Sequence, residues 1–324
     1  MGFKGFVYPV NPFSPSIQGL TAYPSIKKIP WHVDLAIVAT PAHVVPQIVE
    51  ECGEAGVDGV IIVSSGFGET GMDGKALEER IIKLKDMYNM RIIGPNCLGP
   101  LCPESKVTYN PKASMEIGNI GFASQSGGHA TTLVEIQEIR GLYYNRGLSF
   151  GNQIDVNCLD VLNYYADNSE IDVIGMYLES TGSANGKDFF LKMKEVTPKK
   201  PVVIWKGGQT QAGTRAAASH TGAISSAFQI WKTAVTQAGG TFVTYSTEFW
   251  DVLHLFSCIL PIQRFLRGNR VALLVPGGGN SVEMTDTFSN PSIAFQVPEL
   301  SVKSQEKIGE LFPNVNTSFK NPID

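Results

Sequence analysis

Short apolar runs alternate with amphipathic stretches along the first third of the chain. Apolar residues at helical spacing predict helices over Val44–Ala55 and Ala76–Tyr88. The run Asp34–Ala39 is short and apolar after its first residue, and is expected to be buried on both faces. The predicted strands are Lys4–Val10, Asp34–Ala39, Gly59–Val63 and Met90–Gly94. This alternation predicts a doubly wound parallel sheet, in which ligands bind beyond the carboxyl ends of the strands.

A second alternating series begins at Ile120, after a predicted linker over Asn110–Asn119. The expected strands are Ile120–Ala123, Leu142–Phe150, Asp172–Leu178, Pro201–Ile204 and Thr241–Val243. The expected helices are Gly128–Arg140, Cys158–Ala166, Gly186–Glu195, Ala223–Ala238 and Thr247–Ile259. In outline, this series predicts a flavodoxin-like domain.

A third series starts at Arg270 with a strand, a glycine turn and a helix, and it stops at Asp324. The predicted class is α/β, with a Rossmann-like domain over residues 1–112 and a flavodoxin-like domain over residues 113–266. The start of a second flavodoxin-like domain is expected over residues 267–324. A Rossmann-like domain normally opens with a strand, a glycine-rich turn and a helix, and this first unit does not precede Lys4.

Composition narrows the function classes. The 324 residues carry a formal net charge of −4 and form no basic tract, which disfavours nucleic-acid and membrane-surface binding. No run of about 18 apolar residues predicts a membrane span. The five cysteines have no metal-like spacing, and the histidines stand in no ligand-spaced group, so no bound metal is expected. Buried free thiols and the missing signal core predict a cytoplasmic protein.

Three features could carry chemistry. His220 lies among small residues in the segment Trp205–Ser226, where a neutral imidazole could act as a nucleophile or be merely exposed. Ser126, Gly127 and Gly128 join a strand to a helix, and could either hold an anion or form an ordinary N-cap. Glu179 ends a predicted strand, and could either orient an imidazole or be a plain surface carboxylate.

Four motifs together resemble one family. They are YPVNP from Tyr8, IGPNCLGP from Ile93, GFASQSGG from Gly121 and AASHTGAISS from Ala217. Their order and spacing are similar to those of the NDP-forming acyl-CoA synthetases, the superfamily of succinyl-CoA synthetase. The Ser-His-Thr-Gly form of the last motif resembles the ADP-forming acetate–CoA ligase branch, in α-subunit form.

The resemblance implies residue roles. It implies that His220 carries a phosphoryl group, that Glu179 orients it, and that Ser126, Gly127 and Gly128 bind phosphate. It also implies that coenzyme A lies against the strand ends of the first domain. Cys97 is expected to be a packed small residue rather than a nucleophile, as free cysteines commonly are. The implied CoA contacts are Asn11, Thr40, Pro41, Val63, Ser64, Ser65 and Asn96. Asn152 and Asp155 are candidate contacts for the carboxylate or thioester of the substrate.

The resemblance also implies a reaction and partners. Acyl-CoA, ADP and phosphate would give acid, ATP and CoA through an acyl phosphate and a phosphohistidine, with acetate or another small carboxylic acid as substrate. ADP, ATP and Mg²⁺ would be held by an ATP-grasp β subunit or fused domain, in an α2β2 hetero-oligomer or a fused homodimer. Under this interpretation the chain is truncated at both ends.

Two alternatives remain. Related CoA-binding modules fused to acetyltransferases sense metabolites without catalysis, although they lack the phosphorylated histidine that the SHTG motif supplies here. The other alternative is a succinyl-CoA synthetase α subunit, which ordinarily ends near its second domain, whereas this chain continues beyond Arg270.

Overall fold

The computed structural model describes residues 2–210, 212–213, 228–261, 268–293, 295–312 and 318–324. The chain divides into two compact units, Met1–Ile262 and Gln263–Asp324. Each unit is described by itself.

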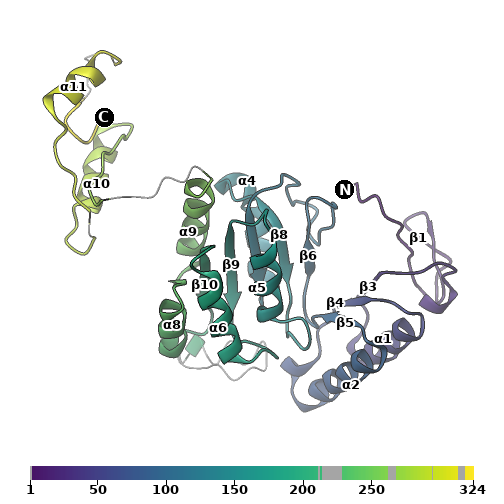
Figure 1. The fold of residues 1–324 in the computed structure, drawn as a ribbon. Coiled ribbons are helices and arrows are strands. Elements are labelled where there is room, and N and C mark those ends of the chain that lie inside the picture. Colours follow the sequence, from purple (N-terminus) through teal and green to yellow (C-terminus); the bar gives the residue numbers. More distant parts are fainter. Residues whose placement is uncertain (1, 211, 214–227, 262–267, 294, 313–317) are drawn as a thin grey trace. The chain divides into compact units, whose positions relative to one another are not determined.

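The first unit opens with a small parallel sheet of order β3-β4-β5. Its strands are β3 (Leu35–Val38), β4 (Gly59–Ile62) and β5 (Arg91–Ile93), and the helices α1 (Val45–Glu54) and α2 (Met72–Tyr88) connect them. Figure 1 shows α1 and α2 lying together beside these strands. Short 3-10 turns at Ile26–Lys28, Ala42–Val44 and Gly68–Thr70 and a hairpin of β1 (Ser16–Ile17) and β2 (Leu20–Thr21) complete this part.

Two predictions for this region are wrong. Lys4–Val10 forms no strand; within the described residues it contributes one isolated bridge, between Val10 and Tyr23, and Phe6 is 87% exposed. Without a neighbouring strand, an extended segment cannot satisfy its backbone groups through a ladder. The run at β3 is not buried on both faces, since Leu35 is 44% and Ile37 62% exposed on the edge strand.

The second sheet of this unit has the order β11-β10-β9-β7-β8-β6. Five strands run parallel: β7 (Ile120–Ser124), β8 (Tyr144–Ser149), β9 (Val173–Leu178), β10 (Val202–Lys206) and β11 (Thr241–Val243). The sixth, β6 (Gly99–Leu101), pairs antiparallel with β8 and was not predicted. β6 has three residues, one of them Pro100, and so short a run shows no hydrophobic periodicity from which a strand could be predicted.

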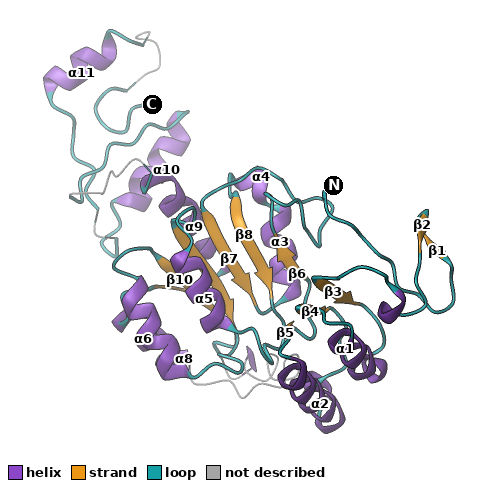
Figure 2. Ribbon diagram, turned by 45° about the vertical axis from the view of Figure 1, so that its right-hand side comes forward, coloured by secondary structure: helices purple, strands orange, loops and turns teal. Residues whose placement is uncertain are grey.

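Helices cover both faces of this sheet (Figure 2). One face packs on α5 (Cys158–Asp167), α6 (Gly186–Val196) and α8 (Phe228–Gln237). The other packs on α3 (Gly127–Glu135) and α9 (Ser246–Ile259). The helix expected over Gly128–Arg140 is divided at Ile136 into α3 and α4 (Gln137–Arg140). The result is the three-layer arrangement that the strand–helix alternation predicted.

Polar side chains join the two sheets. The Asp155 carboxylate, from the loop after β8, accepts from the backbone N of Ile92 at 2.7 Å and from Arg91 Nε at 3.1 Å. Asn152 Nδ2 donates to Glu69 Oε2 and to Glu78 Oε1, each at 2.7 Å. These contacts fix the first sheet against the loop that follows β8.

The second unit contains α10 (Gly278–Phe288) and α11 (Val302–Gly309). The predicted glycine turn and helix correspond to α10. The strand expected from Arg270 is wrong: in the described part of this unit the pairing amounts to isolated bridges, Arg270 with Gln296 and Leu274 with Ile323. Leu274 is 72% exposed, so no apolar layer covers this segment as it would a sheet strand. Across the described residues, no helix is long and apolar enough to cross a membrane.

The contact between the sheets gives a stability prediction. Asp155→Ala removes the acceptor of a backbone N–H and an Arg91 contact, and should lower the free energy of unfolding by about 1–3 kcal/mol. Asp73→Ala, at an exposed position of the first turn of α2, should change it by about 0.5 kcal/mol or less. Urea denaturation of both variants measures this. Equal losses of unfolding free energy in the two variants would show that Asp155 stabilises the protein no more than an exposed surface carboxylate does.

Candidate functional site

The carboxyl ends of β3, β4 and β5 meet at Ser64. Its hydroxyl donates to the carbonyl oxygen of Thr40 at 2.5 Å and accepts from the Thr40 backbone N at 3.1 Å. The carbonyl oxygen of Ser64 accepts from the backbone N of Asn96 at 2.9 Å. Asn96 has a φ of 58°, a left-handed conformation that asparagine tolerates better than most residues. Three of the residues predicted to contact CoA therefore lie together at one edge of the sheet.

Thr40 carries a polar atom that needs a partner. Its Oγ1 is buried and has no hydrogen bond within the part of the chain that the structure describes. A buried hydroxyl without a partner destabilises a protein by about 1–3 kcal/mol, so such atoms commonly meet a ligand or a water. This atom fits an edge that receives a polar ligand.

The other predicted CoA residues flank this cluster less tightly. Val63 continues the ladder between β3 and β4, because its backbone N donates to the carbonyl oxygen of Val38 at 2.9 Å. Pro41 and Ser65 are exposed. Asn11 Oδ1 accepts from the backbone N of Phe13 at 2.8 Å, which closes a turn of its own. Among the described residues, no hydrogen bond joins Asn11 to the Ser64 cluster.

Ser126 begins α3 as its N-cap. Its hydroxyl accepts from the backbone N of His129 at 3.3 Å, while Ser124 Oγ donates to the Ser126 carbonyl at 2.7 Å. The backbone N–H groups of Gly127 and Gly128 lie in the first turn, where a helix offers no internal acceptor. The capping role is therefore present, and it leaves donors at the positive end of the helix that could meet an anion.

Glu179 is not a plain surface carboxylate, because only 8% of its surface is exposed. Tyr177 Oη donates to Glu179 Oε1 at 3.1 Å. Burial raises the pKa of Tyr177 far above its ordinary value, so the phenol keeps its proton for this bond. The carboxylate is thus held at the end of β9 by a neutral donor.

Gln125 is a residue of this site that the sequence did not single out. Its side-chain oxygen accepts from the backbone N of Glu179 at 2.8 Å and of Ser180 at 3.0 Å. Its Nε2 donates to Ser180 Oγ at 3.3 Å. Gln125 is buried in the structure. The sequence signal that could have identified it is a long amide side chain between a predicted strand and a predicted helix start. It ties the loop at the start of α3 to the end of β9.

An aromatic cluster closes one side of the carboxylate. The rings of His129 and Tyr177 are 4.4 Å apart, and those of His129 and Trp205 are 4.3 Å apart. Burial lowers the pKa of His129, which favours the neutral imidazole. With a neutral His129 this cluster carries no charge, and Tyr177 connects it to Glu179.

Gly207 lets Glu179 approach β10. A Cβ on this residue would lie 2.3 Å from Tyr177 Oη and 3.0 Å from Glu179 Cγ. Only glycine therefore fits against both side chains without a shift. The backbone N of Gly207 donates to the Leu178 carbonyl at 2.9 Å, which continues the ladder to the level of Glu179.

His220 lies outside the described residues, so its predicted role stays a prediction. The structure describes both sides of its segment, β10 and α8. Because Lys206 pairs with Leu178, the chain leaves β10 at the edge of the sheet where Glu179 lies.

Asn152 and Asp155 lie in the contact between the two sheets. Asn152 Oδ1 also accepts from Asn96 Nδ2 at 3.4 Å, which connects it to the Ser64 cluster. The Asp155 carboxylate is engaged by Ile92 and Arg91, with Lys85 Nζ at 3.6 Å. These contacts give both side chains a structural role, and the substrate contact expected of them stays a prediction.

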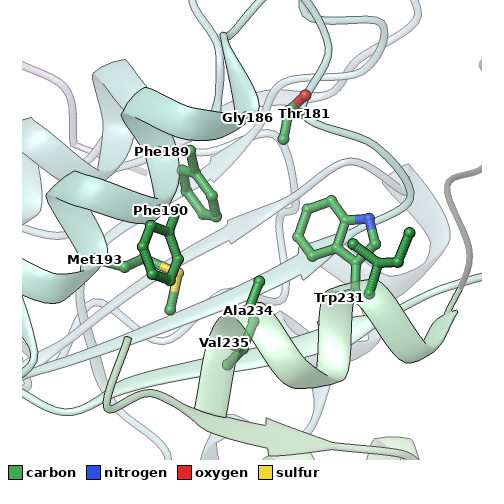
Figure 3. A pocket seen from close by; sticks show the side chains of 9 residues that line it. Thr181, Gly186, Phe189, Phe190, Met193, Trp231, Ala234 and Val235 are labelled. Carbon is green, nitrogen blue, oxygen red and sulfur yellow. The ribbon is translucent and has the colours of Figure 1, made fainter. Parts of the chain in front are cut away.

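A cavity of about 240 Å³ lies between α6 and α8. One of its lining residues, Thr181, follows Glu179 closely in the chain. Figure 3 shows Trp231 facing Phe189 and Phe190 across it, and the Phe189 and Trp231 rings are 6.3 Å apart. Its lining is almost entirely apolar, so the cavity offers shape without a polar group to orient a substrate.

Two further predictions concern thiols and metals. Cys97 is buried and donates to the Ile62 carbonyl at 3.3 Å, and burial raises its pKa to about 12, so its packed role holds. The expectation that no histidine stands in a ligand group is wrong for His32. Its ring lies 3.3 Å from Asp58 and 3.8 Å from Asp34, residues brought together by the amino ends of β3 and β4. All three side chains are exposed, which is typical of a surface ion pair.

Family models match both sheets of the first unit. One, described as a CoA binding domain, matches residues 4–103. Another, described as a succinyl-CoA ligase like flavodoxin domain, matches residues 117–256. They confirm the predicted classes of the first two domains.

Whole-chain relatives agree. The alpha subunit of acetate–CoA ligase (ADP-forming) II from Pyrococcus furiosus is 36% identical over 320 residues, covering 99% of this chain and 68% of that subunit. The 4-hydroxybutyrate–CoA ligase (ADP-forming) of Nitrosopumilus maritimus is 33% identical, covering 100% of this chain and 46% of that enzyme. A structure of dinucleotide forming acetyl-coenzyme A synthetase 1 from Ca. Korarchaeum cryptofilum, with phosphate and ADP, has a TM-score of 0.83 at 33% identity, covering 100% of this chain and 68% of that one.

Fold and site define an α/β chain that joins a CoA-binding domain to a succinyl-CoA ligase-like domain. The chain belongs to the NDP-forming acetyl-CoA synthetases, the ADP-forming acetate–CoA ligase family, as an α-type chain. The resemblance inferred from the four motifs is thereby confirmed. The chain spans about two thirds of the alpha subunit above and about half of the 4-hydroxybutyrate enzyme.

The burial of His129 gives a pH prediction. Its pKa is lowered in the folded protein, so below about pH 6.5 the unfolded chain binds a proton that the folded chain resists. The free energy of unfolding should therefore fall as the pH falls below that value. His129→Phe keeps an aromatic ring against Tyr177 and should lose this part of the pH dependence. Urea denaturation between about pH 5 and 8 measures it; identical slopes for both proteins would refute the assignment.

Proposed function

We propose that this chain is the CoA-binding and phosphoryl-carrying part of an ADP-forming acyl-CoA synthetase. The reaction converts acyl-CoA, ADP and phosphate to acid, ATP and CoA, reversibly. The observation that carries the proposal is the juxtaposition of a buried carboxylate, Glu179, and a glycine-rich helix start, through the single side chain of Gln125. Such a pair suits a phosphorylated imidazole, which needs an acceptor for its N–H and donors for its phosphate.

CoA is assigned to the carboxyl edge of β3, β4 and β5. The CoA binding domain model covers this sheet, and parallel sheets bind ligands at that edge. The buried hydroxyl of Thr40 and the side chain of Asn96 are the polar groups that support the assignment. The remaining contacts proposed are those of Asn11, Pro41, Val63, Ser64 and Ser65.

The phosphoryl group is assigned to His220. Phosphate attacks the thioester carbonyl, the C–S bond breaks, and an acyl phosphate forms. An imidazole nitrogen of His220 then attacks phosphorus, the P–O bond breaks, and the carboxylic acid leaves as its anion. The other ring nitrogen keeps its proton, which Glu179 accepts in a hydrogen bond that stabilises the cationic ring. Transfer of the phosphoryl group from nitrogen to ADP gives ATP.

The nucleotide is assigned to a partner. Relatives named as alpha subunits support an ATP-grasp β subunit or an equivalent fused domain that holds ADP, ATP and Mg²⁺. A small carboxylic acid is the proposed substrate; relatives named for acetate and for 4-hydroxybutyrate support this range.

The CoA assignment predicts a loss of affinity without a loss of stability. Thr40→Val replaces a buried, unpaired hydroxyl by a methyl group, so the free energy of unfolding should stay equal or rise. CoA affinity should fall about 5–10-fold, because a contact worth about 1 kcal/mol is lost. Thr236→Val, exposed on α8, is the matched control and should change neither. Titration calorimetry with CoA measures the affinity of both variants. An unchanged CoA affinity in Thr40→Val would show that Thr40 does not contact CoA.

The phosphoryl assignment predicts loss of a covalent intermediate. With an ATP-grasp partner and labelled ATP, His220→Asn should abolish acid-labile, base-stable labelling of this chain. Glu179→Gln should retain labelling but slow it by about 10²–10⁴-fold, because the charged ring loses its carboxylate. Thr221→Ala should have a far smaller effect. Persistent labelling of His220→Asn would contradict the proposal and make His129, next to Gly128, the candidate carrier.

A further inference from the structure

Lys206, the last residue of β10, is a lysine with 0% of its surface exposed. Its ammonium donates to the carbonyl oxygen of Gly207, and Nζ lies 5.7 Å from the centre of the Trp231 ring. An isolated ammonium in an apolar interior is destabilising by several kcal/mol unless an opposite charge balances it. The proposed reaction gives this lysine no role.

Among the described residues, the carboxylate of Glu179 is the opposite charge that acts on Lys206. Strands β9 and β10 are neighbours, and Lys206 pairs with Leu178, the residue before Glu179. The Gly207 peptide lies between the two groups. Its carbonyl accepts from Lys206, and a Cβ on its α-carbon would lie 3.0 Å from Glu179 Cγ.

The two charges influence each other across this peptide. Burial lowers the pKa of Lys206, and the Glu179 carboxylate acts against that effect by raising it. On the Glu179 side, the titratable groups in the described residues are Tyr177 and, with its ring tilted against that of Tyr177, His129. On the Lys206 side, α8 presents the uncharged ring of Trp231. Lys206 is therefore a cation that acts on Glu179 across this peptide.

We propose that Lys206 is a positioning residue for Glu179: its buried ammonium balances the carboxylate across the Gly207 peptide and holds it where the imidazole must meet it. The kinetic part of this inference rests on the proposed function, whereas the charge pairing does not. Lys206→Met keeps the length and apolar stem of the side chain and removes the charge. It would remove this cation from the surroundings of the buried Glu179 carboxylate, whose contacts should then rearrange.

The charge pairing is tested on the chain alone. Lysine labelled with ¹³C at Cε and ¹⁵N at Nζ allows Lys206 to be titrated by NMR, with its signal identified by its absence from Lys206→Met. Glu179→Gln removes the carboxylate that raises the pKa of Lys206, so that pKa should fall and the titration curve of Lys206 should move to lower pH. An unchanged titration of Lys206 would overturn the pairing.

Lys200 is the matched control. It precedes the same strand at the opposite end, is partly buried, and donates to the carbonyl oxygens of Tyr165 and Asn168. Six residues of extended chain place it about 20 Å from Lys206, beyond the reach of Glu179. Its titration should be the same in Glu179→Gln as in the unmodified protein. A shift as large as that of Lys206 would mean that Glu179→Gln disturbs the whole sheet, and would overturn the specific pairing.

The positioning role is tested with the ATP-grasp partner in single-turnover labelling of the chain. Lys206→Met should slow labelling about 10–100-fold, in the range expected when an orienting group is displaced. Lys206→Arg should recover part of the rate, Lys200→Met should keep it, and the KM for phosphate should not change in any variant.

Three outcomes would contradict the positioning role. A normal labelling rate in Lys206→Met would leave the lysine a purely structural residue. A raised KM for phosphate with an unchanged rate would assign it to substrate binding instead. Equal slowing by Lys200→Met would indicate a general loss of packing. Absence of labelling in the unmodified protein would instead refute the proposed function, while the NMR titration would still decide the pairing.

Discussion

Burial of a carboxylate at the end of β9 is the constraint on which the site depends. A buried carboxylate is destabilising by several kcal/mol unless its surroundings compensate. Here Tyr177 donates to Glu179 and packs against the rings of His129 and Trp205, and Gln125 accepts from the backbone N of Glu179. In such surroundings electrostatic interactions are stronger than in water, so the carboxylate can act on a partner group with little loss to screening.

The framework that holds this carboxylate also connects it to the first domain. Gln125 precedes α3 and contacts the end of β9, so it joins the helix start to the segment that carries the carboxylate. Asn152, after β8, contacts Asn96 and the carboxylates of Glu69 and Glu78. Short polar contacts therefore run from the strand ends of the small sheet to those of the large one, which a substrate spanning both would require.

Much of the fold followed from periodicity, because most buried parallel strands are continuous apolar runs between helices of clear amphipathic spacing. The wrong or missing strand predictions have one cause: whether a segment pairs or is buried depends on its neighbours in the fold, which a local sequence pattern does not show. Lys4–Val10 is apolar enough for a strand but, among the described residues, is paired only at its end, by the single bridge of Val10 to Tyr23, and β6 is a strand because β8 lies beside it. The exposure of Leu35 and Ile37 depends on β3 being an edge, which no local pattern reports.

The site was partly predictable for the same reason. Strand ends are visible in a sequence, so Thr40, Ser64, Asn96, Ser126 and Glu179 could be named from their positions and the motifs. The partners that give them their chemistry come from other strands. Gln125 acts on Glu179 across 54 residues, and Lys206 approaches it only because β10 pairs with β9. A lysine in an apolar run predicts no role until its neighbours in the sheet are known.

The central claim is that Glu179 and the start of α3 serve one phosphorylated imidazole. The most direct measurement is a crystal structure of this chain with its ATP-grasp partner, phosphorylated from ATP in the absence of CoA and trapped cold. The phosphoryl group should lie on His220, with the other ring nitrogen about 2.6–3.2 Å from the Glu179 carboxylate and phosphate oxygens within hydrogen-bond distance of Gly127 or Gly128 N–H. A phosphorylated His220 bound to other groups, or a phosphoryl group on another residue, would contradict it.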